Sequence, residues 1–259
     1  MKTFTIGKKK IVLKEEWMVG FITTWIVGLL AHAYRFFNFL PIWDSIYNFT
    51  GVGSTYTLGR WFLGYAGLIT SMFDLPWVNG AFSLFYISIV VILLTEMFEI
   101  KNKGMIVLCA AIFVSFPTVV SSFAYMYTAD AYLLAFLLAT LAVYLTWCVK
   151  KWGTIAGMIC LAFAMGIYQA YATVAIVLVL LYIIRQFVIE KLDFLEAVRK
   201  DLKYLGMLVG GAVLYAVILK ITLIRYNITL PGYQGIGALG IMSLGQYKAA
   251  LQKTLYHFR

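Results

Sequence analysis

The run GTIAGMICLAFAMGIYQAYATVAIVLVLLYII, residues 153–184, contains no charged side chain. As a single helix it would be about 48 Å long at 1.5 Å per residue, well beyond a bilayer core of about 30 Å. Two lysines precede the run and an arginine follows it. Basic flanks favour the cytoplasmic side of a membrane, so both ends of the run belong on one side. The run therefore predicts a helical hairpin of two spans, at about 152–166 and 170–185.

The rest of the 259-residue chain has the same apolar character. It is 63% hydrophobic and 12% charged, with a mean hydropathy of +0.89, whereas soluble proteins are about 45–50% apolar and about 25% charged. This composition predicts an all-α polytopic membrane protein with about seven transmembrane helices. Residues 1–225 would form the membrane domain, and residues 226–259 an outer segment. The remaining apolar runs predict spans at about 17–37, 78–96, 105–121, 131–149 and 204–224.

The charged residues indicate how the chain is oriented. The net charge is +10, but the basic residues lie in short loops between apolar runs, which favours contacts with lipid headgroups over nucleic-acid binding. On this layout most lysines and arginines lie on the side of the N-terminus, which is therefore predicted to be cytoplasmic. Asp44, Asp74 and Asp130 are the only acidic residues predicted on the outer side, and before the last span only Arg35 and Arg60 join them. This sorting predicts chemistry at the outer face.

Two outer segments are long enough to carry that chemistry. Residues 38–77 form an aromatic link between the first two spans, and long links are often functional. Within it, residues 61–73 are expected to lie flat as an interfacial helix. After the last span, residues 231–237 have a loop composition, and the apolar stripe over residues 241–255 predicts a second interfacial helix.

Asp44 is the candidate base in the first outer link. It follows Pro41 and Trp43 a few residues beyond the first span. Partial desolvation at a membrane surface would make its carboxylate a better proton acceptor. The alternative is a solvated loop aspartate that forms a turn with Ser45.

Arg60 and Arg35 are candidate phosphate ligands, because a guanidinium matches a phosphate in two-point geometry. The alternatives are snorkelling to the interface or pairing with an outer aspartate. Asp74 precedes Leu75 and Pro76 and is expected to cap the second span.

Five further residues are candidates for a sugar or acceptor pocket. Asp130, near the start of the fourth span, could equally be placed there by the helix dipole. Tyr125 and Tyr127 could stack on a sugar ring or belong to an ordinary interfacial aromatic belt. Tyr168 and Gln169 lie at the outer tip of the hairpin, where a glutamine needs a hydrogen-bonding partner or ligand. We find no catalytic motif such as HExxH, a P-loop or GxSxG in the sequence.

Four stretches resemble the bacterial type-II glucosyltransferase family, membrane enzymes associated with O-antigen glucosylation and grouped with the GT-C glycosyltransferases. The stretches are Asn38…Trp43-Asp44-Ser45, Gly59-Arg60-Trp61, Phe116-Pro117…Tyr125-Met126-Tyr127…Asp130 and Gly166-Ile167-Tyr168-Gln169-Ala170-Tyr171. The last is the most specific. Together they cover roughly residues 17–190. GT-C enzymes are commonly longer, so the resemblance also suggests a short member or a fragment.

The resemblance implies a GT-C-like fold and transfer of glucose or another hexose from a polyprenyl-phosphate donor to a cell-surface glycan. The reaction would take place on the outer face of the bacterial cytoplasmic membrane. A flippase and a donor-making synthase are the implied partners. The resemblance also maps the catalytic carboxylate of the first outer loop onto Asp44. Adjacent acids are common at this point in the family, whereas Ser45 follows Asp44 here, which favours a single base over a divalent-cation site. A flippase or an accessory subunit for polyprenyl-linked sugars is the competing interpretation.

Overall fold

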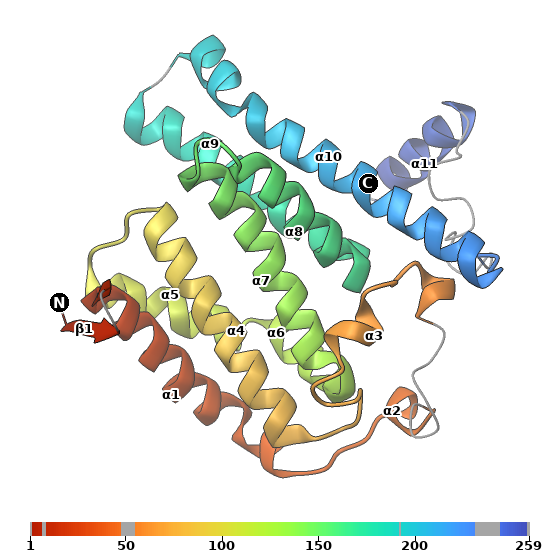
Figure 1. Cartoon of the computed structure of the whole chain (residues 1–259), viewed down its shortest axis with the longest axis horizontal. Helices are drawn as coiled ribbons and strands as arrows, with labels where there is room; N and C mark the ends of the chain where they lie inside the picture. The colour runs from red at the N-terminus through yellow and green to blue at the C-terminus, as the bar shows by residue number, and fades with distance from the viewer. Residues whose placement is uncertain (1, 7–8, 48–54, 192, 231–243, 258–259) are drawn as a thin grey trace.

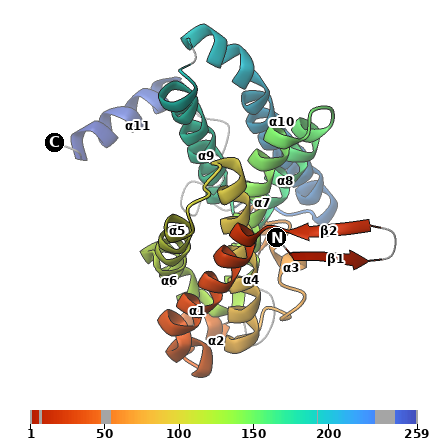
Figure 2. The same ribbon diagram turned by 90° about the vertical axis from the view of Figure 1, so that its left-hand side faces the viewer.

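The computed structural model describes residues 2–6, 9–47, 55–191, 193–230 and 244–257, and its regular structure is helical apart from one β-hairpin (Figures 1 and 2). In that hairpin β1 (Lys2–Ile6) pairs antiparallel with β2 (Lys9–Leu13). The helical elements in chain order are α1 (Glu15–Phe37), α2 (Trp43–Tyr47), η2 (Tyr56–Leu58), α3 (Leu63–Ala66), α4 (Pro76–Met97), α5 (Lys103–Ser115), α6 (Pro117–Ser122), η3 (Phe123–Tyr125), α7 (Met126–Cys148), α8 (Gly153–Ile167), η4 (Gln169–Tyr171), α9 (Ala172–Arg185), η5 (Gln186–Glu190), α10 (Phe194–Tyr226) and α11 (Leu244–His257).

The long helices run between two ends of a bundle (Figure 1). At one end Lys14, just before α1, pairs with Glu96 near the end of α4 at 2.6 Å. We call this the Arg185 end, because Arg185 at the end of α9 pairs there with Glu99, just after α4, at 3.1 Å. At the opposite end α1 finishes beside η3, which leads into α7. Arg60 contacts α7 at that end, which we call the Arg60 end.

Helices α8 and α9 form the predicted helical hairpin. The end of α8 lies at the Arg60 end, where the Phe62 amide donates to the Gly166 carbonyl at 2.8 Å. The short η4 turns the chain, and α9 returns to the ion pair of Arg185 with Glu99. The hairpin interpretation is confirmed, and its turn lies within two residues of the predicted position.

The chain is a multi-pass all-α membrane protein. Within the described residues the stretches long and apolar enough to cross a membrane are Glu15–Phe37, Pro76–Met97, Lys103–Cys148, Gln169–Glu190 and Arg199–Tyr226. By length and composition this count is five, against the seven predicted. The difference arises because Gly153–Ile167 is apolar but shorter, and because α5 and α7 fall within one long helical stretch.

Two sequence expectations for individual helices are wrong. The third span was expected to reach residue 121, but α5 ends at Ser115, because Phe116 is extended (ψ 140°) ahead of Pro117. Residues 61–73 do not lie flat as an interfacial helix. Only α3 is helical there, and Trp61 is 7% exposed because it packs into the bundle. The predicted tail helix does form, as α11, whereas the predicted loop at 231–237 lies outside the described residues.

Small residues bring α7 and α8 together at the centre of the bundle (Figure 1). One face of α7 presents Ala131, Ala135, Ala139 and Ala142, all fully or almost fully buried. On α8, a Cβ added at Gly157 would lie 2.7 Å from the Ala142 carbonyl oxygen. Close backbone approach of this kind drives helix association in membranes, where lipid tails compete for apolar contacts.

Replacing Gly157 with alanine should therefore separate the two helices. We expect Gly157→Ala to destabilise the protein by about 1–3 kcal/mol, the usual cost of overpacking, and to lower its melting temperature in detergent. Gly206→Ala on α10 is the matched control, because an added Cβ there has no atom within 4 Å. Equal melting of the two variants would contradict close packing at Gly157.

Candidate active site at the Arg60 end

A loop from the first link docks onto the turn of the hairpin through a polar network. The Gln169 side-chain amide donates to the Leu58 carbonyl at 2.8 Å and to the Tyr215 hydroxyl at 2.9 Å. The Tyr215 hydroxyl donates in turn to the Gly59 carbonyl at 3.0 Å. Gln169 and Leu58 are 111 positions apart in the chain. The network therefore joins the first link, the hairpin and α10 at one point.

Two glycines make room for this docking. Gly59 has a left-handed φ of +72°, which favours glycine over any residue with a Cβ. A Cβ at Gly59 would also lie 2.6 Å from Gln169 Nε2 and 2.8 Å from the Tyr215 hydroxyl. At Gly166 an added Cβ would lie 2.7 Å from the ring of Trp61. Two of the stretches that carry the family resemblance thus fit against each other directly.

The docked loop places Arg60 among tyrosines. Its Nη1 donates to the Tyr132 hydroxyl at 3.1 Å. The guanidinium carbon lies 4.5 Å from the centre of the Tyr168 ring, a cation–π distance. The rings of Tyr132 and Tyr168 are themselves stacked, with centroids 5.5 Å apart. The guanidinium is therefore held in orientation by side chains of α7 and the hairpin turn.

The charge of Arg60 is not neutralised by the described part of the protein. No described carboxylate lies within ion-pair distance, and Arg60 Nε is buried without a hydrogen-bond partner among the described residues. In the same loop, burial, with a contribution from Tyr65, raises the pKa of Tyr56 to about 12, so its hydroxyl stays neutral and supplies no counter-charge. Leaving a cation without a counter-ion is costly. The arrangement therefore suits an anionic ligand, and a guanidinium fork matches phosphate oxygens.

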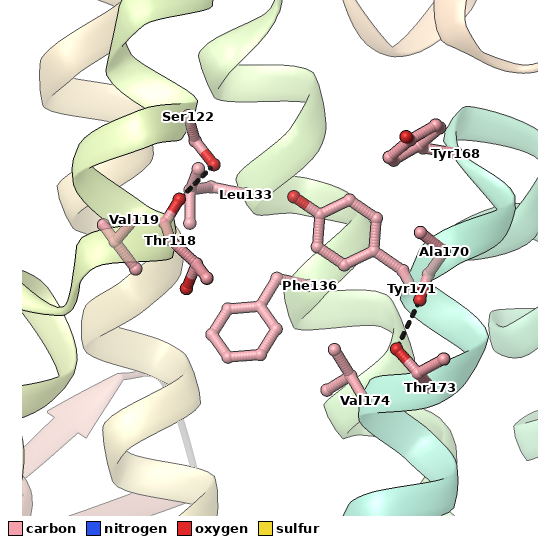
Figure 3. Close-up of a pocket in the computed structure, with 10 residues that line it drawn as sticks. All are labelled: Thr118, Val119, Ser122, Leu133, Phe136, Tyr168, Ala170, Tyr171, Thr173 and Val174. Atoms are coloured by element: carbon pink, nitrogen blue, oxygen red, sulfur yellow. Dashed lines mark hydrogen bonds between the residues drawn. The ribbon is translucent and has the colours of Figure 1, made fainter. Parts of the chain in front are cut away.

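A cavity of about 370 Å³ is lined in part by Tyr168 (Figure 3), the residue whose ring Arg60 contacts. Thr118 and Ser122 of α6 face it from one side, and Tyr168 and Tyr171 from the other. Leu133 and Phe136 of α7, with neighbouring aliphatic side chains, make most of its lining apolar. Because Tyr168 borders both the cavity and Arg60, an apolar group and an anionic group of one ligand could be held side by side.

Asp130 is engaged within the protein and does not line this cavity. It is 2% exposed, and its carboxylate accepts hydrogen bonds from Asn79 Nδ2 at 3.0 Å and Thr70 Oγ1 at 3.2 Å. Asn79 Oδ1 accepts from the Leu75 amide at 2.9 Å. Because α7 begins at Met126, Asp130 lies beyond its first turn, and the helix dipole is not the main reason for its position. Asp130 instead ties residues 70–75 to α7.

The other predicted charged residues are dispersed over the Arg60 end. Asp44 is exposed on α2. The Arg35 guanidinium donates to the carbonyls of Phe123, Leu40 and Ala124, so it joins the end of α1 to η3. The expected capping role of Asp74 is wrong. The N-cap of α4 is Leu75, and no side chain at this position forms a capping hydrogen bond.

Of the remaining predicted pocket residues, Tyr125 is 41% exposed, whereas Tyr127 belongs to the hydrophobic core. The structure thus brings together Arg60, Tyr168 and Gln169. In the described part of the chain, no group of three or more His, Cys, Asp or Glu side chains is placed to hold a metal ion.

Sequence reasoning missed Tyr132 and Tyr215, which hold Arg60 and its loop, and Thr70 and Asn79, which bond Asp130. The tyrosines sit in apolar runs rich in aromatic residues, where nothing local distinguishes them. Asn79 carried a usable signal, because an amide at the start of an apolar span requires a polar partner.

A family model described as glucosyl transferase GtrII matches residues 33–257 of the chain. The chain belongs to this family. The enzyme is therefore a glucosyltransferase, which confirms the resemblance and favours catalysis over the flippase and accessory-subunit interpretations. The match includes the docked loop, the hairpin turn and Asp130. Searches of curated proteins and of solved structures find no match to this chain.

The two contacts at Gly59 lead to a test of the docking. Gly59→Ala should strain the backbone and push Gln169 and Tyr215 out of hydrogen-bonding position, so Arg60 should lose its orientation. We expect glucosyl transfer to fall at least about tenfold, since misplacing a catalytic group by about 1 Å can cost about 100-fold. Transfer assays on membranes, with Gly206→Ala as control, measure this. Unchanged transfer by Gly59→Ala would show that the loop does not depend on the network.

Proposed function

We propose that the enzyme transfers glucose from a polyprenyl-phosphate donor to a cell-surface glycan at the outer face of the bacterial cytoplasmic membrane. The observation that carries this proposal is the oriented Arg60 guanidinium, which has a buried Nε without a partner among the described residues. In a family of glucosyl transferases, such a group fits the phosphate that leaves when the glucosyl group is transferred.

The surroundings of Arg60 support a lipid-linked donor. The cavity that shares Tyr168 with Arg60 is mainly apolar and lies among α6, α7 and α9. A phosphate with an apolar chain would place its charge on Arg60 and its first isoprene units in the cavity. Tyr168 and Gln169 would then lie near the glucosyl group. Tyr125, exposed at the end of η3, offers further aromatic surface toward the acceptor, whereas the buried Tyr127 would support it from the core.

The chemical step needs a base and an oriented leaving group. Asp44 would take the proton from an acceptor hydroxyl, whose oxygen then attacks the anomeric carbon of glucose. The bond between that carbon and the phosphate oxygen breaks, and polyprenyl phosphate leaves with its added negative charge stabilised by Arg60. The exposure of Asp44 supports a base that a large hydrophilic glycan can reach. Arg35 would act indirectly, by holding η3 in place.

The charge distribution supports the orientation. The five ion pairs among the described residues all lie at the Arg185 end, together with most of the lysines and arginines. The positive-inside rule assigns that end, and the N-terminus, to the cytoplasm. The Arg60 end would then face outward, and a separate synthase and flippase would supply the donor to the outer leaflet.

Removing the Arg60 charge should have a large effect on transfer. We expect Arg60→Gln to lower kcat/KM by about 100-fold or more, as loss of about 3 kcal/mol of leaving-group stabilisation predicts. Arg60→Lys should recover only part of the lost kcat/KM, because lysine keeps the charge but lacks the planar, forked guanidinium. The readout is transfer of labelled glucose from polyprenyl phosphate glucose in membranes.

Arg225→Gln is the matched control for this experiment, because Arg225 is exposed in the last turn of α10. Equal activity of Arg60→Gln and Arg225→Gln would rule out a role for Arg60 in the chemistry.

Asp44→Asn tests the base. The amide cannot accept the hydroxyl proton, so we expect kcat to fall at least about 100-fold, within the usual range for loss of a general base. Donor binding, measured as thermal stabilisation by polyprenyl phosphate glucose, should be retained. Asp193→Asn, at an exposed position just before α10, is the control. Near-normal turnover by Asp44→Asn would refute this assignment.

A further inference from the structure

Asp74 is the unexplained charged group at the Arg60 end. Both of its carboxylate oxygens are buried, and neither has a hydrogen-bond partner among the described residues. A buried carboxylate without donors is costly, because it loses hydration and gains nothing in return. Such a group is rare in a native protein and calls for an explanation.

The backbone around Asp74 is held firmly in this unfavourable arrangement. Ser71 and Met72 both have left-handed φ values, of 52° and 55°. Non-glycine residues in this region carry strain, which persists only where the surroundings enforce it and which often marks functional sites. Here the enforcing contacts are Thr70 to Asp130 before the strained pair and the Leu75 amide to Asn79 after Asp74. The buried Asp130 therefore positions the segment that carries Asp74.

Arg35 does not supply the hydrogen bonds that Asp74 lacks. Arg35 lies within electrostatic range of its carboxylate, but the two form no ion pair. The Arg35 guanidinium instead donates to backbone carbonyls through Nε, Nη1 and Nη2. Asp74 thus has a positive charge nearby, but no hydrogen-bond donor among the described residues.

We propose that Asp74 binds a hydroxyl group of the sugar substrate in the transfer site. This inference rests on the proposed function, and it assigns Asp74 to substrate binding and Asp130, Thr70 and Asn79 to positioning it. A carboxylate that only accepts hydrogen bonds is suited to sugar hydroxyls. A metal ion would need more ligands, but Asp130 already accepts two hydrogen bonds, and the described residues contain no cluster that could hold a metal.

The first test exploits the cost of the unpartnered charge. Without substrate, Asp74→Asn should melt at a higher temperature than the wild type, because it removes a buried charge that nothing bonds. In the same variant kcat/KM for glucosyl transfer should fall by about 10- to 100-fold, the range expected for loss of one hydrogen bond to a charged group. Asp74→Ala, which has no acceptor, should lose at least as much. Asp193→Asn is the matched control and should change neither quantity.

The second test identifies which sugar Asp74 binds. Thermal stabilisation is compared for polyprenyl phosphate glucose and polyprenyl phosphate. If Asp74 binds the glucosyl group, the extra stabilisation by the glucosylated lipid disappears in Asp74→Asn, while stabilisation by the plain lipid phosphate remains. If it binds the acceptor, that difference persists and the KM for the glycan fraction labelled by the wild type rises at least about tenfold. Either result supports the proposal.

Wild-type kinetics and no loss of sugar-dependent stabilisation in Asp74→Asn and Asp74→Ala would overturn the proposal. Absence of transfer by the wild-type enzyme from polyprenyl phosphate glucose would instead count against the proposed donor, and the two failures are therefore distinguishable. Thr70→Val tests the positioning role. Thr70→Val should raise the KM of whichever substrate is affected by Asp74→Asn, and it should lower kcat less than it raises that KM. A wild-type KM in Thr70→Val would remove Thr70 and Asp130 from this role.

Discussion

The hydrogen bonds of Gln169 are the constraint on which the Arg60 end depends. An amide in an apolar bundle has few alternative partners, so leaving its donors unpaired would cost more than a typical hydrogen bond is worth. Gln169 donates to Leu58 and Tyr215, and Tyr215 donates to Gly59. These bonds hold an aromatic loop against the hairpin turn, where it would otherwise be free to partition into the membrane interface.

The two ends of the bundle hold their charges in different ways. At the Arg185 end, acids and bases neutralise one another, as in the pairs of Glu96 with Lys14 and Glu99 with Arg185. At the Arg60 end, two charged groups are held by neutral dipoles: Arg60 by tyrosines and Asp130 by an amide and a hydroxyl. Neutral partners orient a charge without cancelling its field. Preorganised charges of this kind can act on a substrate, whereas paired charges mainly stabilise the fold.

Sequence reasoning succeeded where a local pattern has one physical solution. An uncharged run too long for one crossing, with basic residues at both ends, can only turn back on itself, and α8 and α9 do so. It failed where partners outside the pattern decided the outcome. The aromatic segment after Arg60 looked interfacial, yet Trp61 fits against Gly166, and Asp74 looked like a helix cap, yet its carboxylate caps nothing. The apolar or polar character of a side chain does not by itself show whether it will contact lipid or the protein core.

The sequence by itself determined that this is a helical membrane protein with a hairpin between basic flanks. Hydrophobic length and flanking charge act locally, through the thickness and potential of the bilayer. Only the tertiary structure decided which side chains form the site. Gly59 meets Tyr215 across 156 positions, and Arg60 meets Tyr132 across 72. Contacts at such separations depend on how the helices pack, and that packing arises from small residues such as Gly157 and Gly166, whose role becomes visible only once their neighbours are in place.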